Sequence, residues 1–389
     1  MTVEPRIRNG ICMTAHPKGC ALAVQKEIDY VKSQPKFNGA KKVLVVGGST
    51  GYGLSSRISL AFGSGAGTLN ISFEKEGSEK RPATPGFYNN RAFDEKAKAE
   101  GLIAESINAD AFSHETRKIA IERIKELFGK VDMIVYSLAS PVRPDPDTGE
   151  LYKSCLKPLG ETYTAKSVNP EKGTVTEVSI EPADESEIAP TVKVMGGEDW
   201  MLWIKALKEA DVLEDGFKSI AYSYIGPELT MAVYRKGTIG KAKEHLEATA
   251  KEITEFTKDI NGQAWVSVNK ALVTRSSSVI PVVPLYISLL FKIMKEKEIH
   301  EGCIEQMQRM FVQKIYNGST AIVDEEGRLR LDDLEMRDDV QAEVEKRWDS
   351  ITSDTLSEMT DIETYKSDFL KLHGFGFDEI DYTEDVDFL

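Results

Sequence analysis

Lys41–Gly53, KKVLVVGGSTGYG, is the stretch that decides the fold of this 389-residue chain. Val43–Val46 is a short, unbroken apolar run, which is typical of a strand buried on both faces of a parallel sheet. Glycines then crowd the next seven positions, and Leu54–Phe62 follows with apolar residues at helical spacing. A strand, a glycine turn and a helix in this order are the context in which a glycine motif predicts a dinucleotide site.

The glycine spacing suggests how this turn would hold a cofactor. Gly47 permits a sharp exit from the strand, where a Cβ would clash. Gly51 lets a pyrophosphate approach the main chain, and the free N–H groups at the start of the helix would face the anion. A tight turn without a ligand is the alternative. A Walker-type phosphate loop is excluded, because no Lys-Ser or Lys-Thr pair closes the motif.

Composition limits the classes of protein that fit. Hydrophobic residues make up 41% of the chain and charged residues 29%, so it can bury a sizeable core and stay soluble. The net charge of −14 argues against nonspecific nucleic-acid binding. Four scattered cysteines fit a reducing compartment, and the most apolar run, Val279–Phe291, is too short to cross a bilayer. We expect a cytoplasmic protein without a nucleic-acid or membrane partner.

An N-terminal arm, residues 1–40, precedes the glycine turn. Cys12, His16 and Cys20 are evenly spaced in it, which raises a metal site. Zinc usually takes four ligands in recognised pairs, and the proline and glycine between these three should break any helix that would align them. We therefore expect no metal.

The second strand is predicted at Thr68–Glu74, TLNISFE. It ends in Glu74, about 20 residues past the glycines, where an acidic side chain can hydrogen-bond the adenosine ribose. A carboxylate there would repel a 2′-phosphate, so we predict NADH rather than NADPH. Lys75, if turned inward, could instead accept that phosphate. A solvated Glu–Lys pair at a strand end is the alternative.

Strands and helices continue to alternate. Leu102–Asp110 and Val131–Ala139 read as strands, and Asn89–Glu100 and Glu115–Phe128 as helices. Asp110 follows its strand and is a candidate contact for the adenine. The alternation predicts an α/β fold, with a Rossmann-like doubly wound parallel sheet that binds ligands outside the carboxyl ends of its strands.

Residues 143–189 interrupt this alternation. They are polar and rich in Thr, Pro and Gly, and they include the alternating stretch Thr174–Ile180. We expect a β-hairpin insertion rather than a domain boundary. A helix then returns with Trp200 and Trp203 on one face, which we interpret as core.

A tyrosine and a lysine follow the next strand, Lys218–Gly226. Tyr224 lies at the carboxyl end of that strand, where a site should be. Tyr234 and Lys243 are nine residues apart, which on a straight helix would put them on nearly opposite faces. We expect Tyr234 to precede a helix and Lys243 to lie on its first turns.

The rest of the chain is predicted in outline. Trp265–Thr274 should be a further strand that ends near the nicotinamide. Val279–Ile293 suits core, or the wall of an acyl pocket. Residues 320–389 are acidic and should add a helical C-terminal region, including a helix at Leu334–Trp348 and a surface tail at Gly374–Leu389.

The whole chain resembles the trans-2-enoyl-CoA and single-chain enoyl-acyl-carrier-protein reductases, a long branch of the short-chain dehydrogenase/reductase superfamily. The resemblance is carried by the stretches GGSTGYGL, SFEK, YSLASPVR, VKVMGGEDW, AYSYIGPE, GTIGKAKEHLEATA and KALVTRSSSVIPVVPLY. The mark of this branch is Tyr-x8-Lys, present here as Tyr234 and Lys243.

The resemblance implies the site residues and a single domain over residues 1–389. Tyr234 and Lys243 would be catalytic, and Tyr224 would bind the substrate. The cofactor-binding residues would be Gly47, Gly48, Ser49, Thr50, Gly51, Tyr52, Phe73, Glu74, Asp110, Ala111, Leu138, Ala139, Lys243, Leu272, Val273 and Thr274.

The implied activity is NADH-dependent reduction of the C2=C3 double bond of trans-2-enoyl thioesters in fatty-acid metabolism. The substrate would be an enoyl-CoA such as crotonyl-CoA, or an enoyl-acyl-carrier protein. Tyr234 would donate a proton and stabilise the enolate, and Lys243 would lower the pKa of that tyrosine. The alternative is an NAD-dependent ketoreductase, which would use a four-residue Tyr/Lys spacing and an upstream serine. We expect a monomer, because the insertion and the C-terminal region could cover the site.

Overall fold

A seven-stranded parallel sheet forms the centre of the protein. The structure is a computed structural model that describes residues 1–8 and 10–389, so Asn9 of the expected arm and the side chain of Val279 lie outside the described part. The strands lie in the order β13-β12-β11-β6-β3-β4-β5. Their bounds are β3 Lys42–Val46, β4 Gly67–Ser72, β5 Ala104–Asn108, β6 Val131–Tyr136, β11 Leu213–Ser223, β12 Gln263–Val268 and β13 Leu329–Arg330.

Strand β3 occupies the middle of this sheet. Its residues Val43–Val46 are all buried, between Met133–Tyr136 of β6 on one side and β4 on the other. The strand order reverses between β3 and β6, which makes the carboxyl end of this pair the place where such sheets bind ligands. The predicted doubly wound parallel sheet is confirmed.

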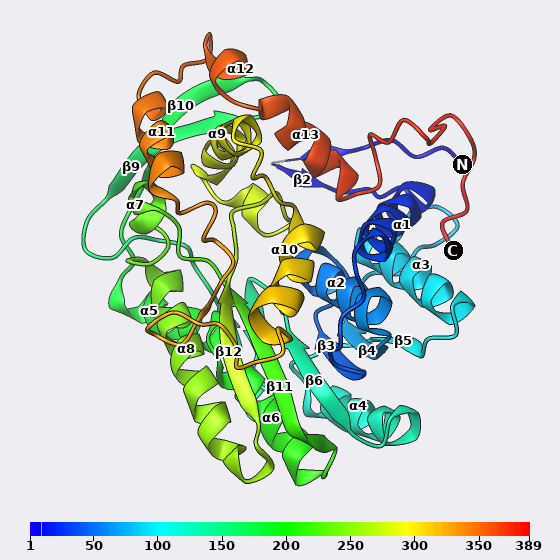
Figure 1. Cartoon of the computed structure of the whole chain (residues 1–389). Helices are drawn as coiled ribbons and strands as arrows, with labels where there is room; N and C mark the ends of the chain where they lie inside the picture. Colours follow the sequence, from blue (N-terminus) through cyan, green and yellow to red (C-terminus); the bar gives the residue numbers. More distant parts are fainter. Residues whose placement is uncertain (9) are drawn as a thin grey trace.

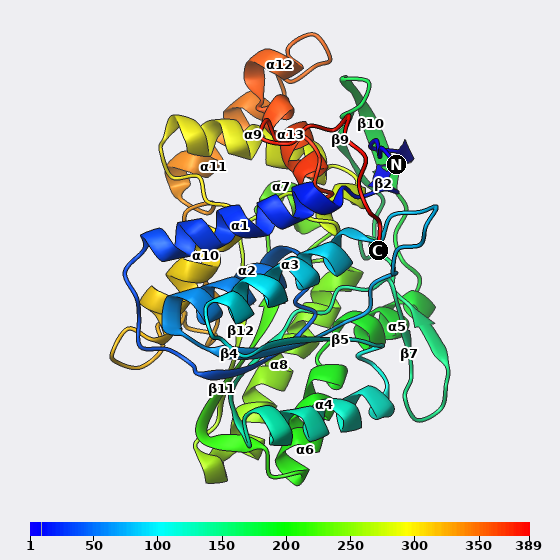
Figure 2. The same ribbon diagram turned by 90° about the vertical axis from the view of Figure 1, so that its right-hand side faces the viewer.

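Helices cover both faces of the sheet, which Figure 2 shows edge-on. One face carries α2 Gly51–Ile58, α3 Pro85–Ala99, α10 Cys303–Arg309 and, outermost, α1 Pro17–Ser33; the other carries α4 His114–Leu127, α6 Glu198–Glu209 and α8 Thr238–Phe256. Trp200 and Trp203 of α6 are fully buried, so their interpretation as core is confirmed.

Helix α1 corrects an expectation about the N-terminal arm. Pro17 and Gly19 do not break a helix, because Pro17 stands at its first position, where a missing N–H costs nothing. His16 caps the helix through Nδ1, which accepts the Gly19 N–H at 3.2 Å. Within residues 1–8 and 10–389 no group of three or more metal-ligating side chains occurs.

The polar insertion contains more than one hairpin. Strands β7 Val142–Pro144 and β8 Leu151–Lys153 pair antiparallel, as do β9 Tyr163–Asn169 and β10 Thr174–Ile180. Helix α5, Glu185–Met195, begins before residue 189. A further short pair, β1 Ile7–Arg8 and β2 Ile11–Cys12, lies in the N-terminal arm.

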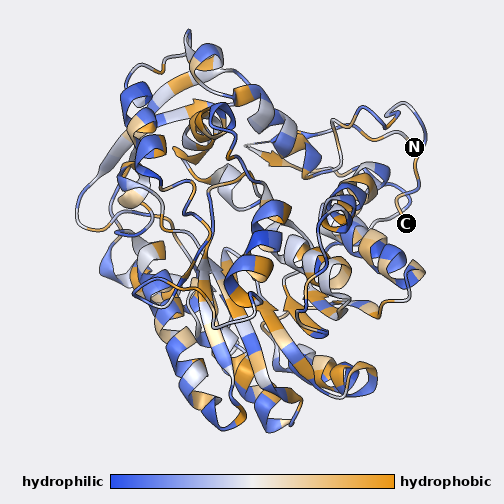
Figure 3. Cartoon of the chain, viewed as in Figure 1, coloured by the Kyte–Doolittle hydropathy of each residue, from blue (hydrophilic) through white to orange (hydrophobic). Residues whose placement is uncertain are grey.

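The C-terminal helices lie over the carboxyl ends of the strands (Figure 1). They are α9 Val283–Glu296, α11 Asp338–Trp348, α12 Leu356–Met359 and α13 Ile362–Lys371. Helix α9 is the apolar centre of this layer, as the orange colour in Figure 3 shows, and it shares one buried cluster with Tyr234 and Leu272. The apolar segment that could have been core or pocket wall is therefore mostly core.

Strand β12 is shorter than predicted, because it ends at Val268 rather than Thr274. The Asn269 N–H still donates to the Ser223 carbonyl of β11, but the N–H groups of the next two residues bond to side chains. The N–H of Lys270 donates to Gln306 Oε1 at 2.9 Å, and that of Ala271 donates to Glu335 Oε2 at 2.8 Å. The sequence pattern stays apolar here because the loop is buried, not because it is a strand.

The acidic tail lies on the surface but is anchored. Val386 and Phe388 are buried, and the Tyr88 hydroxyl donates to the Phe388 carbonyl at 3.0 Å. The Val386 N–H donates to the Met1 carbonyl, so both termini lie together, at the right of Figure 1. Across the described ranges, no helix has the length and apolar character that a membrane crossing requires.

Candidate active site

The glycine turn after β3 lies against the end of β6. Gly47 has φ +92°, and a Cβ there would overlap the carbonyl oxygen of Ser137. Gly51 also has a positive φ, +54°, but a Cβ there would meet only the Thr274 methyl at 3.9 Å, so space is open beside it. Thr50 is the N-cap of α2 and makes no side-chain cap, which leaves the first N–H groups of the helix available to an anion.

Asn70 supports this turn, and the sequence analysis did not single it out. It is fully buried in β4; its Oδ1 accepts the Gly48 N–H at 2.8 Å, and its Nδ2 donates to Asn90 Oδ1 at 3.0 Å. The signal that could have identified Asn70 is an amide side chain inside a buried strand, since a buried polar group needs hydrogen-bond partners.

Glu74 faces the glycine turn. Its carboxylate accepts the Ser49 hydroxyl at 2.7 Å and the Thr84 hydroxyl at 2.5 Å. Arg275 approaches it to 3.6 Å, from the loop after β12. Phe73, its neighbour, is 79% exposed, which is the highest value among the large apolar side chains that the structure shows exposed. A ribose and an adenine would find a carboxylate and an uncovered aromatic ring here.

The residues after β5 and β6 complete this edge of the sheet. Asp110 Oδ1 accepts the Phe112 N–H at 3.0 Å, and the indole N–H of Trp203 donates to the Ala111 carbonyl at 3.1 Å. Leu138 and Ala139 follow β6 directly, and Ala139 is exposed. The structure thus brings the predicted adenosine and nicotinamide contacts to the carboxyl edge.

The loop Leu272–Thr274 lies over the glycine turn. Leu272 and Val273 are buried in the apolar layer around α9. Ser277 braces the loop, because it accepts the Thr274 N–H at 2.9 Å and donates to the Leu272 carbonyl at 2.6 Å. The Thr274 methyl is the nearest group to the open space at Gly51.

Tyr52 differs from the other predicted cofactor contacts. Its hydroxyl donates to the Lys270 carbonyl at 2.7 Å and accepts the Gln306 side-chain amide at 3.1 Å. The ring therefore ties α2 to the loop after β12. Only the backbone of Tyr52 is placed to meet a pyrophosphate.

The two predicted phenols lie side by side. Tyr224 and Tyr234 pack edge to face, with ring centroids 4.7 Å apart at 79°. Tyr234 is buried between α7, Glu228–Met231, and α8, so its expected place before a helix is confirmed. Burial first, and the Glu335 carboxylate second, raise its pKa. The lowering of this pKa that we expected from Lys243 stays a prediction.

Lys243 lies on the second turn of α8, as expected. Its Nζ donates to the Tyr222 carbonyl at 3.0 Å, at the carboxyl end of β11. Burial lowers its pKa to about 8, against the opposing pull of Glu247. An ammonium has three donors, so further N–H groups remain for ligand hydroxyls.

Two buried polar groups without partners lie at the carboxyl ends of β11 and β12. Ser223 Oγ and Asn269 Nδ2, at the ends of β11 and β12, have no hydrogen-bond partner among residues 1–8 and 10–389. Buried donors and acceptors are normally paired, so these two groups suit a polar ligand. The open glycine turn and these groups fit a dinucleotide.

Glu335 was missed by the sequence analysis. It reaches the site from the connection between β13 and α11, and the Tyr224 hydroxyl donates to it at 2.9 Å. It stands within the acidic stretch LDDLEMRDD, where nothing distinguishes it from solvated carboxylates.

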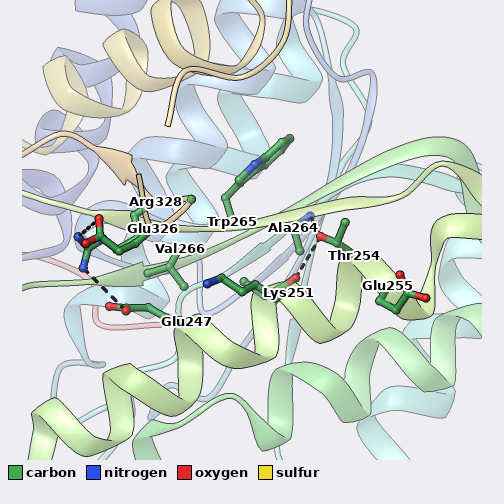
Figure 4. A pocket seen from close by; sticks show the side chains of 11 residues that line it. Glu247, Lys251, Thr254, Glu255, Ala264, Trp265, Val266, Glu326 and Arg328 are labelled. Atoms are coloured by element: carbon green, nitrogen blue, oxygen red, sulfur yellow. Dashed lines mark hydrogen bonds and ion pairs between the residues drawn. The ribbon is translucent and has the colours of Figure 1, made fainter. Parts of the chain in front are cut away.

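A separate pocket lies between α8 and β12 (Figure 4). Lys251, Trp265 and Arg328 are among its lining residues, and none of the predicted site residues lines it. Arg328 is paired there with Glu326 at 2.9 Å and Glu247 at 3.8 Å. No residue of the glycine turn lines this pocket.

Comparison with known families matches the chain in three successive regions. Residues 2–79 match the NAD(P)H binding domain of trans-2-enoyl-CoA reductase, and residues 81–316 match the trans-2-enoyl-CoA reductase catalytic region. Residues 323–386 match a region described as the enoyl reductase FAD binding domain.

Curated relatives match over nearly their whole length. The enoyl-[acyl-carrier-protein] reductase [NADH] of Flavobacterium johnsoniae is 57% identical, over 99% of this chain and 98% of its own. The trans-2-enoyl-CoA reductase [NADH] of Ruminiclostridium cellulolyticum is 55% identical, over 100% and 98%.

Solved structures show the same fold. Trans-2-enoyl-CoA reductase of Treponema denticola in complex with NAD superposes with a TM-score of 0.96, at 52% identity over 99% of this chain and 98% of that one. The enzyme of Clostridium acetobutylicum in complex with NADH gives 0.97, at 46% identity over 100% and 98%.

The flavin named in the third description does not fit residues 323–386. The buried carboxylates there are paired within the protein, Glu335 with two tyrosines and Asp332 with Arg330 at 2.7 Å. None of the unpartnered buried side-chain atoms of the described residues falls in this segment. We assign no flavin chemistry to it.

Proposed function

This chain belongs to the trans-2-enoyl-CoA reductase family, and we propose the roles that its residues play in the reduction of trans-2-enoyl thioesters by NADH. It is an NADH-dependent trans-2-enoyl-CoA/enoyl-ACP reductase. The observation that carries the proposed roles is the Tyr224–Tyr234 pair at the same carboxyl edge as the open glycine turn. The ketoreductase alternative lacks its four-residue Tyr/Lys spacing here.

The cofactor would lie along the carboxyl edge, held mainly by backbone. The turn Gly47–Tyr52 would hold the pyrophosphate through helix N–H groups. Phe73 and Glu74 would meet the adenosine ribose, and Asp110 and Ala111 the adenine. Leu138 and Ala139, with the loop Leu272–Thr274, would enclose the nicotinamide.

Tyr234 would supply the proton of the reaction. NADH supplies a hydride, which reaches C3 of the enoyl group and leaves negative charge on the thioester oxygen. A phenol aimed at that oxygen stabilises the charge most where water is excluded, as in the buried layer below α9. Burial raises the pKa of Tyr234, which keeps the phenol protonated and able to donate. Lys243 would bind the ribose hydroxyls, and Tyr224 would contact the substrate.

Replacing Tyr234 tests this assignment. Tyr234→Phe should lower kcat with crotonyl-CoA on the order of 100-fold, because phenylalanine has no proton to donate. NADH oxidation at fixed enzyme concentration measures it, repeated with NADPH and with an enoyl-acyl-carrier protein. Tyr152→Phe, on the β7–β8 hairpin, is the matched control and should leave kcat unchanged. Wild-type turnover in Tyr234→Phe would refute the assignment.

The remaining proposals concern the whole chain. We propose a single reductase domain over residues 1–389, supported by one sheet that takes strands from β3 to β13. The hairpins of residues 143–189 and the region 320–389 would cover the site without a second copy, so we propose a monomer. The four cysteines are free thiols, which fits our proposal of a cytoplasmic enzyme.

A further inference from the structure

Glu335 joins three segments of the site through one buried carboxylate. It is 0% exposed. Its Oε1 accepts the Tyr224 hydroxyl at 2.9 Å and the Tyr286 hydroxyl at 2.7 Å, and its Oε2 accepts the Ala271 N–H at 2.8 Å. The end of β11, helix α9 and the loop after β12 are therefore held by one side chain from the C-terminal region.

A carboxylate in this place is costly for stability. Burial raises the pKa of Glu335, and Asp332 adds to that effect, while the buried ammonium of Lys270 opposes it. Buried charges often contribute less stability than well-packed apolar groups of the same volume. Three hydrogen-bond donors around it reduce the cost, and they also fix where those donors point.

The geometry separates the roles of the two phenols. A phenol has one proton, so while Tyr224 donates to Glu335 it cannot donate to a substrate. The Tyr234 hydroxyl makes no hydrogen bond to any residue of the described part, which leaves its proton free. Because the two rings pack edge to face, the orientation of Tyr224 limits the orientation of Tyr234.

We propose that Glu335 is a positioning residue: by holding the proton of Tyr224 it fixes that ring against Tyr234 and leaves Tyr234 as the phenol that donates to the substrate. This inference rests on the proposed function, in which Tyr234 is the donor. It gives the C-terminal region a part in the reductase site.

Glu335→Gln is the variant that tests the proposal. Glutamine keeps the shape, but its oxygen can serve either the fixed Ala271 N–H or the phenols, not both. Its NH₂ group would then face Tyr224, which must turn its own proton elsewhere. We expect kcat with crotonyl-CoA to fall on the order of tenfold. The KM for NADH should change less than kcat, because on the cofactor side Glu335 contacts only the backbone N–H of Ala271.

A double-mutant cycle separates positioning from simple loss of stability. If Glu335 acts through Tyr224, the variant Tyr224→Phe/Glu335→Gln should match Tyr224→Phe in kcat within about a factor of two. Asp332→Asn is the matched control: it removes another buried carboxylate of the same connection, which pairs with Arg330 rather than a tyrosine. It should lower the Tm and leave kcat unchanged.

Two results would overturn the proposal. One is a wild-type kcat in Glu335→Gln. The other is a double variant whose loss of kcat combines the full losses of Glu335→Gln and Tyr224→Phe. Failure of the proposed function looks different, since Tyr234→Phe would then also turn over at the wild-type rate. Should Glu335→Gln not fold, Glu335→Asp serves instead. It keeps the charge but withdraws the carboxylate from Tyr224, and wild-type kcat in that variant equally rejects the proposal.

Discussion

Burial shifts the pKa values of Tyr234 and Lys243, the two residues of the Tyr-x8-Lys motif, in opposite directions. The pKa of the Tyr234 phenol rises and that of the Lys243 ammonium falls to about 8, because each shift favours the neutral form. A protonated phenol suits a donor. A lysine with a pKa of about 8 is charged at neutral pH and loses its charge just above it.

Lys243 should therefore give NADH binding a pH dependence. Its ammonium is charged below a pH of about 8 and neutral above it, so the KM for NADH should rise as the pH passes through about 8. Lys243→Met should raise that KM on the order of tenfold at neutral pH and flatten the dependence, because a charge-assisted hydrogen bond is lost. Steady-state kinetics over a pH series measures both.

Lys251→Met is the control for this experiment, since Lys251 is an exposed lysine further along the same helix. It should behave as the wild type at every pH. A pH dependence that survives in Lys243→Met would contradict the assignment.

At the scale of elements, the unit formed by β3, the glycine turn and α2 is the one that we propose positions the nucleotide. Helix α2 begins at Gly51 itself, so the turn and the helix N-terminus are continuous. The turn is held from behind by Asn70, and Gly47 lies directly against Ser137 at the end of β6. These contacts leave the backbone of the turn little conformational freedom. Binding of an anion by backbone N–H groups requires such a fixed backbone.

Gly47→Ala should damage both stability and cofactor binding. Its φ of +92° and the overlap with the Ser137 carbonyl should together lower the free energy of unfolding by about 3 kcal/mol. Urea denaturation followed by circular dichroism measures the loss, and NADH titration should show weakened binding. Gly129→Ala has φ +74° but no atom near its Cβ, so a loss of only about 1 kcal/mol is expected. Equal losses in both variants would show that the close approach to β6 does not matter.

At the scale of the whole molecule, the two ends of the chain lie together, where the Val386 N–H donates to the Met1 carbonyl. The tail alternates buried Val386 and Phe388 with exposed Asp385 and Asp387. Phe388 belongs to the same apolar cluster as Tyr234. The tail therefore extends the apolar cluster that surrounds α9.

Phe388→Ala should release this tail. Losing a buried phenylalanine typically costs about 3–5 kcal/mol, and a position near the terminus places the expected loss at the lower end. Thermal unfolding measures the change in Tm, and Asp387→Ala should shift stability by no more than about 0.5 kcal/mol. A Phe388→Ala protein as stable as the wild type would show that the tail is not anchored.

Local patterns of residues carried most of the fold. The apolar run Val43–Val46, the glycines after it and the alternation that follows predicted the parallel sheet, because each depends on neighbours close in sequence. The same holds for Tyr234 before its helix and Lys243 on it. The prediction failed in two places. Strand β12 stops at Val268, because buried side chains take the N–H groups of Lys270 and Ala271. Pro17 starts a helix instead of breaking one, because the first helical position tolerates proline.

By itself, then, the sequence determined the sheet, the glycine turn after β3, and the places of Tyr234 before α8 and Lys243 on it, since short-range spacing encodes all of them. Only the tertiary structure decided which side chains surround these groups and hydrogen-bond to them. Glu335 meets Tyr286 across 49 residues and Tyr224 across 111, and Arg275 meets Glu74 from another strand end. Such pairs depend on how the chain packs in three dimensions, and the order of residues along one chain leaves no local trace of them.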